Sequence, residues 1–367
     1  MGTKRERQGK MERVREFLRE KNYDALLLSK QSNFSWFTGG GNNHVVIADS
    51  LGVVSLLIFP HQKYLITDNI EANRILGEEL VGQKYEVKIY NWYESEKKKE
   101  IFEELARGMR VASDDGFPGS ILAEAEFAPY RWSLTDEEIR RYRWLGNRSG
   151  RAISKVGYWV RPGATEQQIA AWLSRELMRY GIIPVVILIA ADDRIAKYRH
   201  PIPTDHRVER YVMLVVCGRK WGLIVSLSRL VHFGQLPLEL RQKHDAVVKV
   251  DATFIAHSRP GNKMADIFAR AQQAYAEAGF PQEWKLHHQG GPTGYAGRDY
   301  KCVPGHPGLV LEKQALAWNP SITGTKSEDT IIAFSEGPEI ITPTPDWPMI
   351  PVEVGGMNIE RPDILIR

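Results

Sequence analysis

Four polar segments in the second half of the sequence contain residue types that can transfer protons or bind a charged ligand. They comprise residues 199–201, 226–229, 287–298 and 319–329. Each lies close to the end of a predicted strand, where a rigid sheet can aim side chains from loops into one cavity. Imidazoles suit proton transfer at neutral pH, because their ordinary pKa is about 6.5. Taken singly, each segment also has a purely structural explanation, such as a histidine that caps the turn before Pro201, but together they indicate one shared site.

Predicted strands and helices alternate around these polar segments. Thr135 and Thr165 each precede a Glu or Gln by three residues, the capping-box spacing that begins a helix. Helical spacing also marks residues 248–255 and 264–278. Apolar and β-branched runs of strand type cover 185–189, 212–217, 223–227, 316–318 and 330–334. Groups of strands interrupted by pairs of helices indicate an α+β domain with an antiparallel or mixed sheet.

The first 130 residues have a different pattern. Helical spacing at the start of the chain leads into short strand-type runs, and helical spacing then returns at 70–80. The strand-type runs are 24–28, 45–48, 53–59 and 64–66. This order predicts a small α/β domain of the βαβ kind. We place the boundary near residues 130–136 and divide the chain into domains 1–132 and 133–367.

One short motif occurs twice in the second domain. Arg161-Pro162-Gly163 and Arg259-Pro260-Gly261 each follow a predicted helix and end it. In both places the next predicted helix ends at a glycine eighteen positions further on, Gly181 or Gly279. This spacing indicates that the second domain is a duplicated unit.

Composition excludes several classes of protein. The 367 residues include 49 Lys and Arg against 45 Asp and Glu, and the basic residues of segment 4–19 are interrupted by acids, so we expect no nucleic-acid partner. The longest apolar run, 182–191, is about half of what a membrane span needs. The N-terminus is charged where a signal peptide has its apolar core, and Cys217 and Cys302 cannot form a disulfide framework. We expect a cytoplasmic protein that does not enter a membrane.

A resemblance to a known family covers nearly the whole chain. The segment Asn33-Phe34-Ser35-Trp36-Phe37-Thr38-Gly39, a linking helix and the polar segments described above resemble the "pita-bread" family of creatinase, prolidase, aminopeptidase P and methionine aminopeptidase. The resemblance implies a small N-terminal α/β domain and a C-terminal domain of two pseudo-symmetric halves with a curved antiparallel or mixed sheet. Related enzymes are often dimers, so it also implies a homodimer in which Trp36 and the loop 39–43 reach the partner's pocket.

The family's metal ligands are mostly missing. Residues 287–299 resemble the signature H-x-x-G-H-x-x-G-x-x-x-H-E, but the ligand histidine is Gly291 and the later histidine is Arg298. The remaining ligand positions align with Val215, Ser226, Asn319 and Glu328. Two divalent cations need bridging carboxylates and an imidazole. One carboxylate in five positions does not supply them, so we expect no metal and no other cofactor.

The resemblance also implies roles for the polar residues. His200 lies where the family has a histidine close to the substrate, which in creatinase acts as proton shuttle, so it is our candidate general acid and base. Arg298 is the candidate clamp for a substrate carboxylate, and His287 and Glu328 are supporting polar groups. Creatinase has a glutamate near Ser228, so its substrate is not expected here. The other candidates for substrate binding are His288, Asn319, Ser226, Ser228, Arg229 and Trp36.

Three functions follow from these observations. The preferred one is a metal-independent hydrolase that cleaves a C–N bond in a small molecule or short peptide bearing a carboxylate. The second is a protein that binds a ligand or peptide without turnover, as the peptidase-like domain of the histone chaperone FACT keeps this fold without the metals. The third is a conventional metal-dependent Xaa-Pro peptidase, which fold analogy alone suggests.

Overall fold

Helix α1 (Lys4–Lys21) opens the part of the chain that the structure describes, residues 2–367 of a computed structural model. Thr3 caps its first turn by accepting a hydrogen bond from the main-chain N–H of Glu6, and Asn22 ends it in the left-handed conformation. The chain divides into two units. Unit 1 comprises the residues up to Glu138 together with Trp221–Leu223, and unit 2 comprises Ile139–Lys220 and Ile224–Arg367.

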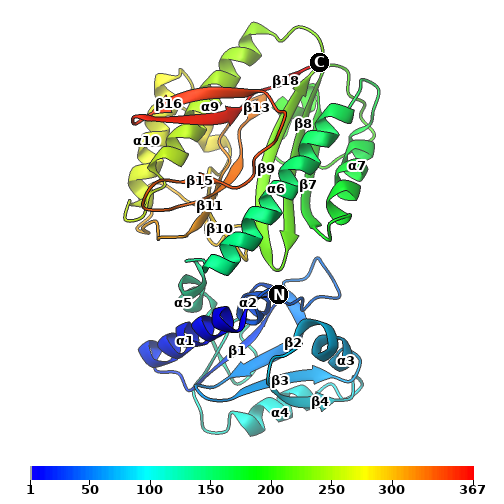
Figure 1. The fold of residues 1–367 in the computed structure, drawn as a ribbon, viewed down its shortest axis with the longest axis vertical. Helices are drawn as coiled ribbons and strands as arrows, with labels where there is room; N and C mark the ends of the chain where they lie inside the picture. The colour runs from blue at the N-terminus through cyan, green and yellow to red at the C-terminus, as the bar shows by residue number, and fades with distance from the viewer. Residues whose placement is uncertain (1) are drawn as a thin grey trace. The chain divides into compact units, whose positions relative to one another are not determined.

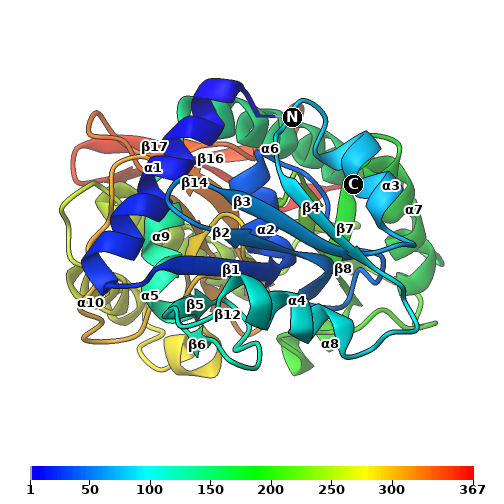
Figure 2. The ribbon, with the colours of Figure 1, turned by 90° about the horizontal axis from the view of Figure 1, so that it is seen from below.

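Unit 1 contains a six-stranded mixed sheet in the order β4-β3-β2-β1-β5-β6. Its strands are β1 (Ala25–Lys30), β2 (Leu51–Ile58), β3 (Lys63–Asp68), β4 (Glu86–Tyr90), β5 (Val111–Ser113) and β6 (Ile121–Leu122). Its further helices are α2 (Gln31–Thr38), α3 (Ala72–Arg74), a π-helix (Ile75–Glu79), α4 (Lys97–Leu105), α5 (Glu124–Phe127) and a 3₁₀ turn (Ala128–Arg131). Figures 1 and 2 show α1 and α4 against this sheet.

Unit 2 contains two four-stranded sheets, in the orders β18-β9-β8-β7 and β10-β11-β14-β15. The strands of the first are β7 (Ile183–Ala191), β8 (Tyr211–Lys220), β9 (Leu223–His232) and β18 (Leu365–Ile366). Those of the second are β10 (Gly290–Thr293), β11 (Ala315–Trp318), β14 (Asp329–Ile332) and β15 (Glu339–Ile340). Two hairpins complete it, β12 (Ser321–Ile322) with β13 (Thr325–Lys326), and β16 (Met349–Val354) with β17 (Met357–Pro362).

The main helices of unit 2 form two consecutive pairs. The helical segments are α6 (Asp136–Trp159), which begins in unit 1, α7 (Glu166–Met178), α8 (Asp193–Lys197), α9 (Leu238–His257), α10 (Met264–Glu277) and a 3₁₀ turn (Glu283–Leu286). The pair α6–α7 precedes the first sheet, and the pair α9–α10 precedes β10 of the second (Figure 1). The α+β fold predicted from the sequence is therefore confirmed.

The duplicated motif forms the same contacts in both halves of unit 2. The N–H of Gly163 donates to the carbonyl of Val208 at 2.8 Å, and the N–H of Gly261 donates to that of Val310 at 2.9 Å. Both glycines have a positive φ, 89° and 86°, which a side chain would disfavour. Thus the weak sequence repeat marks a real structural repeat.

Helix α6 lies close to a later segment because three of its residues have no side chain. A Cβ at Gly146 would lie 1.9 Å from the carbonyl oxygen of Ile341, and one at Gly150 would lie 2.0 Å from that of Pro343. At Gly157 a Cβ would meet the ring of Trp347. Segment 341–347 therefore passes directly over the helix.

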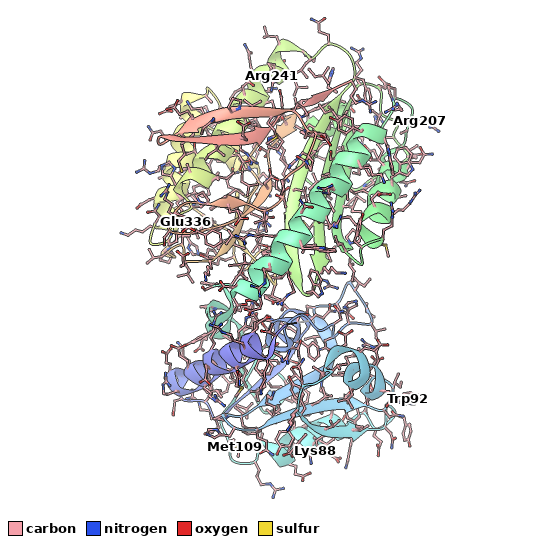
Figure 3. All side chains as sticks on the ribbon, viewed as in Figure 1. Lys88, Trp92, Met109, Arg207, Arg241 and Glu336 are labelled. Atoms are coloured by element: carbon pink, nitrogen blue, oxygen red, sulfur yellow. The ribbon has the colours of Figure 1, made fainter. Side chains whose placement is uncertain are left out.

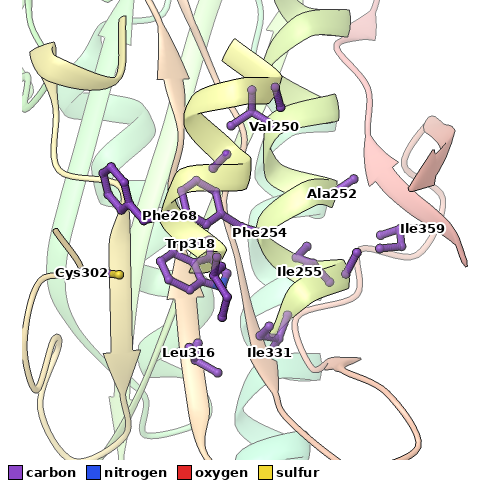
Figure 4. Packing of buried hydrophobic residues seen from close by; sticks show 14 of the residues in the cluster. Val250, Ala252, Phe254, Ile255, Phe268, Cys302, Leu316, Trp318, Ile331 and Ile359 are labelled. Carbon is purple, nitrogen blue, oxygen red and sulfur yellow. The ribbon is translucent and has the colours of Figure 1, made fainter. Parts of the chain in front are cut away.

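Helices α9 and α10 form the main core of unit 2 with strands β11 and β14 (Figure 4). Phe254 stacks on Trp318 with ring centroids 4.4 Å apart, and the indole N–H donates to Ser258. Burying such rings stabilises the unit by about 1.5–3 kcal/mol each. This core supports β10 and β11. Residues 287–289 directly precede β10, and Asn319 directly follows β11.

Two sequence predictions about unit 1 need correction. Residues 45–48 form no strand, and Val45 is 59% exposed, because this run finds no partner strand. The helix expected at 70–80 is a short α-turn followed by a π-helix. Figure 3 labels Trp92 and Met109, two further apolar side chains of this unit that are exposed. Within residues 2–367, no helix is long and apolar enough to cross a bilayer.

Candidate active site

Glu328 lies where the two sheets of unit 2 meet. The segment between β13 and β14 pairs with β9 through an antiparallel bridge between Ser228 and Glu328. The N–H of Ser228 donates to the carbonyl of Glu328 at 3.1 Å, and its hydroxyl donates to the carboxylate of Glu328 at 2.6 Å. The main chain and the side chain of Ser228 therefore both hold Glu328 in place.

Two cations neutralise the carboxylate of Glu328. Lys326 Nζ lies 2.9 Å from its Oε2, and Arg298 Nη2 lies 3.3 Å from its Oε1. Burial by itself would raise the pKa of Glu328, but the charges of Lys326 and Arg298 and the bond from Ser228 outweigh it and lower the pKa to about 2. Glu328 is therefore ionised at neutral pH, and its oxygens are already engaged.

The guanidinium of Arg298 spans two positions that the resemblance aligns with metal ligands. Its Nη1 lies 3.3 Å from the hydroxyl of Ser226, while its Nη2 faces Glu328. Nη1 also donates to the carbonyl of Gly297. The side chain is 14% exposed. The guanidinium of Arg298 thus contacts Ser226 and Glu328, which both lie at aligned ligand positions.

The other aligned positions do not suit a pair of divalent cations. Val215 packs in an apolar cluster with Leu188 and Met213. Gly291 admits no side chain, because a Cβ there would lie 2.6 Å from the carbonyl oxygen of Tyr300. Asn319 offers only a neutral amide oxygen, which is buried without a hydrogen-bond partner among residues 2–367. The donor set therefore lacks the anions and the imidazole that a dinuclear centre requires.

Three histidines that are distant in the sequence converge beside this cationic region. The Nε2 atoms of His200 and His287 lie 3.1 Å apart. The ring of His288 stacks at a tilt on that of His287, with centroids 4.5 Å apart. One nitrogen from each ring can be chosen so that all three lie within 4.8 Å of one another.

The loop that carries His200 is tied to the segment that carries His287. The guanidinium of Arg199 donates to Glu283 and to the hydroxyl of Thr323, both at 2.8 Å. Glu283 begins the 3₁₀ turn that ends just before His287. The ion pair between Arg199 and Glu283 thus keeps the imidazoles of His200 and His287 next to each other, although 87 positions separate them in the chain.

Burial and neighbouring cations favour neutral imidazoles. Burial lowers the pKa of His287 to about 2, with Lys326 adding to the effect, and lowers that of His288 to about 4, with Arg298 adding to it. The pKa of His200 is lowered by burial and then by Lys326, although Glu328 opposes the shift. Neutral rings carry a lone pair that can accept a proton or bind an electrophile.

Two predicted substrate-binding residues lie outside the reach of a ligand. Trp36 is fully buried in unit 1, where its ring packs edge-on against Phe127 and lies under the ammonium of Lys10. Arg229 is 2% exposed, and its guanidinium is used by Thr344, Asp329 and main-chain carbonyls. Both expectations are corrected: these side chains are structural, because internal contacts occupy them.

The remaining predicted residues, apart from Asn319, contact one another or share neighbours. His200, His287, His288, Arg298 and Glu328 share electrostatic contacts in unit 2. Ser226 and Ser228 are almost fully buried and hold Arg298 and Glu328, so they support the site from beneath.

The sequence reasoning missed two neighbours of the site. Lys326 was noted only as part of a polar segment, yet its position two residues from Glu328 predicts the same face of an extended chain. Cys217 has its sulfur 3.2 Å from the hydroxyl of Ser226. Burial raises the pKa of this thiol, and Glu328 adds to the shift, so it stays protonated and is a poor nucleophile. No motif marks it in the sequence.

Two family descriptions match this chain over consecutive ranges. Residues 140–361 match metallopeptidase family M24, and residues 10–131 match the creatinase/prolidase N-terminal domain. The chain belongs to metallopeptidase family M24. The positions that the resemblance aligns with metal ligands therefore lie in a domain of this family.

Individual relatives of the M24 protein are distant. An uncharacterized peptidase of Staphylococcus aureus (strain MW2) is 22% identical over 218 residues, which are 57% of this chain and 62% of the relative. The alignment therefore spans less than two thirds of that protein.

Solved structures match over almost the whole chain. An Xaa-Pro dipeptidase from Bacillus anthracis has a TM-score of 0.78 at 18% identity, covering 98% of this chain and 100% of its own. The N-terminal domain of FACT complex subunit SPT16 from chickpea, Cicer arietinum, has a TM-score of 0.72 at 11% identity, covering 93% and 96%. These matches establish the fold.

Proposed function

We propose that this M24 protein hydrolyses a C–N bond in a small molecule or short peptide that carries a carboxylate. Proton transfer by imidazoles and fixed positive charge would replace the paired metal ions. The observation that carries the proposal is the guanidinium of Arg298, which contacts Ser226 and Glu328 at two of the aligned ligand positions. This contact supports a site in which a fixed positive charge takes the place of metal ions.

A substrate carboxylate would bind next to Arg298 and Lys326. These two cations face a single anion, Glu328, and Lys301 adds positive charge near His200 and His288, so positive charge is in excess at the site. The Nε of Arg298 has no hydrogen-bond partner among residues 2–367. An arginine donor that is unused in a partly buried site is available to a planar oxyanion.

His200 would exchange the protons. It is the most exposed of the three clustered histidines, and its Nε2 contacts that of His287. It would accept a proton from the attacking water as the water oxygen bonds to carbon, and deliver it to the nitrogen as the C–N bond breaks. Such a group typically contributes about 10²–10⁴-fold to the rate.

The test begins with hydrolysis of a panel of dipeptides, N-acyl amino acids and amidino acids by protein treated with a chelator. His200→Ala should then lower kcat/KM about 10²–10⁴-fold on the substrate found. His61→Ala, an exposed histidine of unit 1, is the matched control and should have no effect. Unchanged activity in His200→Ala would remove its role. Two tightly bound metal equivalents, with activity lost on chelation, would favour the metal-dependent peptidase instead.

A second function is a ligand-binding protein without turnover. It is favoured by the saturated carboxylate of Glu328 and by similarity to the SPT16 domain, whose fold this chain shares. It predicts that peptides or amino-acid derivatives bind in an Arg298-dependent manner and are recovered unchanged. Calorimetry combined with mass spectrometry of the recovered ligand distinguishes the two functions.

A further inference from the structure

We propose that His200, His287 and His288 together bind one divalent transition-metal ion, at a place distinct from the five aligned ligand positions. The sequence predicts no metal at those five positions, and this set of donors shares none of them. The further claim that the bound ion inhibits hydrolysis rests on the function proposed above. Binding itself does not.

The spacing of the ring nitrogens carries the proposal. In a tetrahedral zinc site with bonds of about 2.0–2.1 Å, neighbouring nitrogens lie roughly 3.3 Å apart. The Nε2 atoms of His200 and His287 are already 3.1 Å apart. With one nitrogen chosen from each ring, the three histidines lie within 4.8 Å of one another. Small side-chain movements would therefore bring three ring nitrogens to the spacing of a tetrahedral site.

An unused ring nitrogen supports the same conclusion. The Nδ1 atom of His288 is buried and has no hydrogen-bond partner among residues 2–367, so this ring keeps a nitrogen that an ion can use. His287 is only 9% exposed. An unsatisfied buried polar atom costs about 1–3 kcal/mol, so an ion bound through this nitrogen would remove a cost that packing alone leaves.

The donors also define the class of ion. Imidazole nitrogens suit zinc, copper, nickel and cobalt, whereas magnesium and calcium prefer oxygen ligands. Three ligands leave a fourth position open for water or a substrate atom. Because Lys326, Arg298 and Lys301 lie nearby and Glu328 offsets only part of their charge, we expect weaker binding than at a site with anionic ligands.

Metal binding and catalysis would both need the lone pair of His200. The lone pair of His200 that accepts a proton from water would be used in the metal bond. We therefore expect zinc to inhibit hydrolysis, and a chelator to restore it. The bound ion would thus be a reversible inhibitor of an enzyme whose catalysis does not use it.

Binding is tested on chelator-treated protein with zinc alone, by calorimetry, and with cobalt, by visible absorption. The expected result is one equivalent of zinc and a cobalt spectrum of a four- or five-coordinate site. His287→Ala and His288→Ala should each weaken binding at least tenfold, and His61→Ala should not. Thermal melting of each apo variant shows whether it is folded. No binding, two equivalents, or unchanged affinity in folded variants of both histidines would overturn the site.

The two proposals fail in different ways. Hydrolysis by the chelated protein together with no zinc binding would overturn the metal site and leave the proposed function standing. Stoichiometric zinc binding without turnover of any substrate would support the site and overturn the hydrolase. Hydrolysis that rises with zinc would overturn the inhibition and favour a metal-bound water as nucleophile.

Discussion

Glu328 and Asp329 are consecutive residues, but they belong to two different charged groups. Glu328 faces the candidate active site with Arg298 and Lys326. Asp329 faces the opposite side of the extended chain, where it pairs with Arg229 at 2.9 Å and Arg361 at 2.7 Å. Both carboxylates are nearly fully buried, so burial alone does not distinguish a site from a structural network.

The balance of charge distinguishes them. Around Asp329, two acids and two arginines form a neutral set, because Asp251 also pairs with Arg361 and with the hydroxyl of Ser327. Around Glu328, two cations meet one anion, and the nearby imidazoles are neutral. A neutral buried network needs no ligand to balance its charge, whereas a partly open site with excess charge favours binding of an anion.

The sharpest test of this comparison is to break the neutral network. Arg361→Leu leaves Asp251 and Asp329 buried without their shared cation, so we expect a loss of about 3–5 kcal/mol in the free energy of unfolding. Chemical denaturation measures it. Arg143→Ala removes an exposed ion pair with Glu339 and should cost less than about 1 kcal/mol. Equal losses in the two variants would contradict the structural role of the network.

His244 provides a structural contrast to the site histidines. Both of its ring nitrogens have partners, Thr325 and the carbonyl of Pro362, and burial lowers its pKa to about 4. An unfolded histidine titrates near 6.5, so the unfolded state takes up the proton first as pH falls. Stability from this group is present above about pH 6.5 and is lost towards pH 4, by as much as about 3 kcal/mol.

This prediction is measured by denaturation at several pH values between these limits. His244→Gln cannot take up the proton, so its unfolding free energy should fall less steeply with decreasing pH, by up to about 1.4 kcal/mol per pH unit. Both proteins share all other titrating groups. Parallel pH profiles would show that His244 does not titrate in this way.

The smallest expected effect concerns the excess charge at the site. Lys326→Met removes one of the two cations that contact Glu328 and leaves this carboxylate paired with Arg298, so the positive charge of the site falls by one. We expect a rise in KM of about tenfold for a carboxylate-bearing substrate, equivalent to about 1.4 kcal/mol. Lys326→Arg keeps the charge and should restore most of the affinity. A change confined to kcat in Lys326→Met would assign this lysine to another step.

Local signals in the sequence were enough to predict much of the fold. Thr165 and Gln168 form the expected capping box at the start of α7, because that interaction involves only neighbouring residues. The repeated Arg-Pro-Gly motif marked the two halves of unit 2 for the same reason. In contrast, the run 45–48 has strand propensity but no partner, and pairing decides whether a strand forms.

The candidate site was predictable where spacing fixed the register and not where packing decided the outcome. Spacing put Arg298 and Glu328 in one predicted site, and their side chains lie 3.3 Å apart. The sequence predicted that His200 and His287 share a site but not that their rings would be in direct contact, because the ion pair between Arg199 and Glu283 joins distant segments. The burial of Trp36 likewise depends on tertiary contacts with Phe127 and Lys10.

The position of Arg298 has a consequence for how the protein matures. A catalytic ion must be acquired from the surroundings after synthesis and can be lost again, whereas a guanidinium is covalently part of the polypeptide. On the function proposed above, this positive centre is in place as soon as the chain has folded around Ser226 and Glu328, so its formation does not depend on the supply of trace elements.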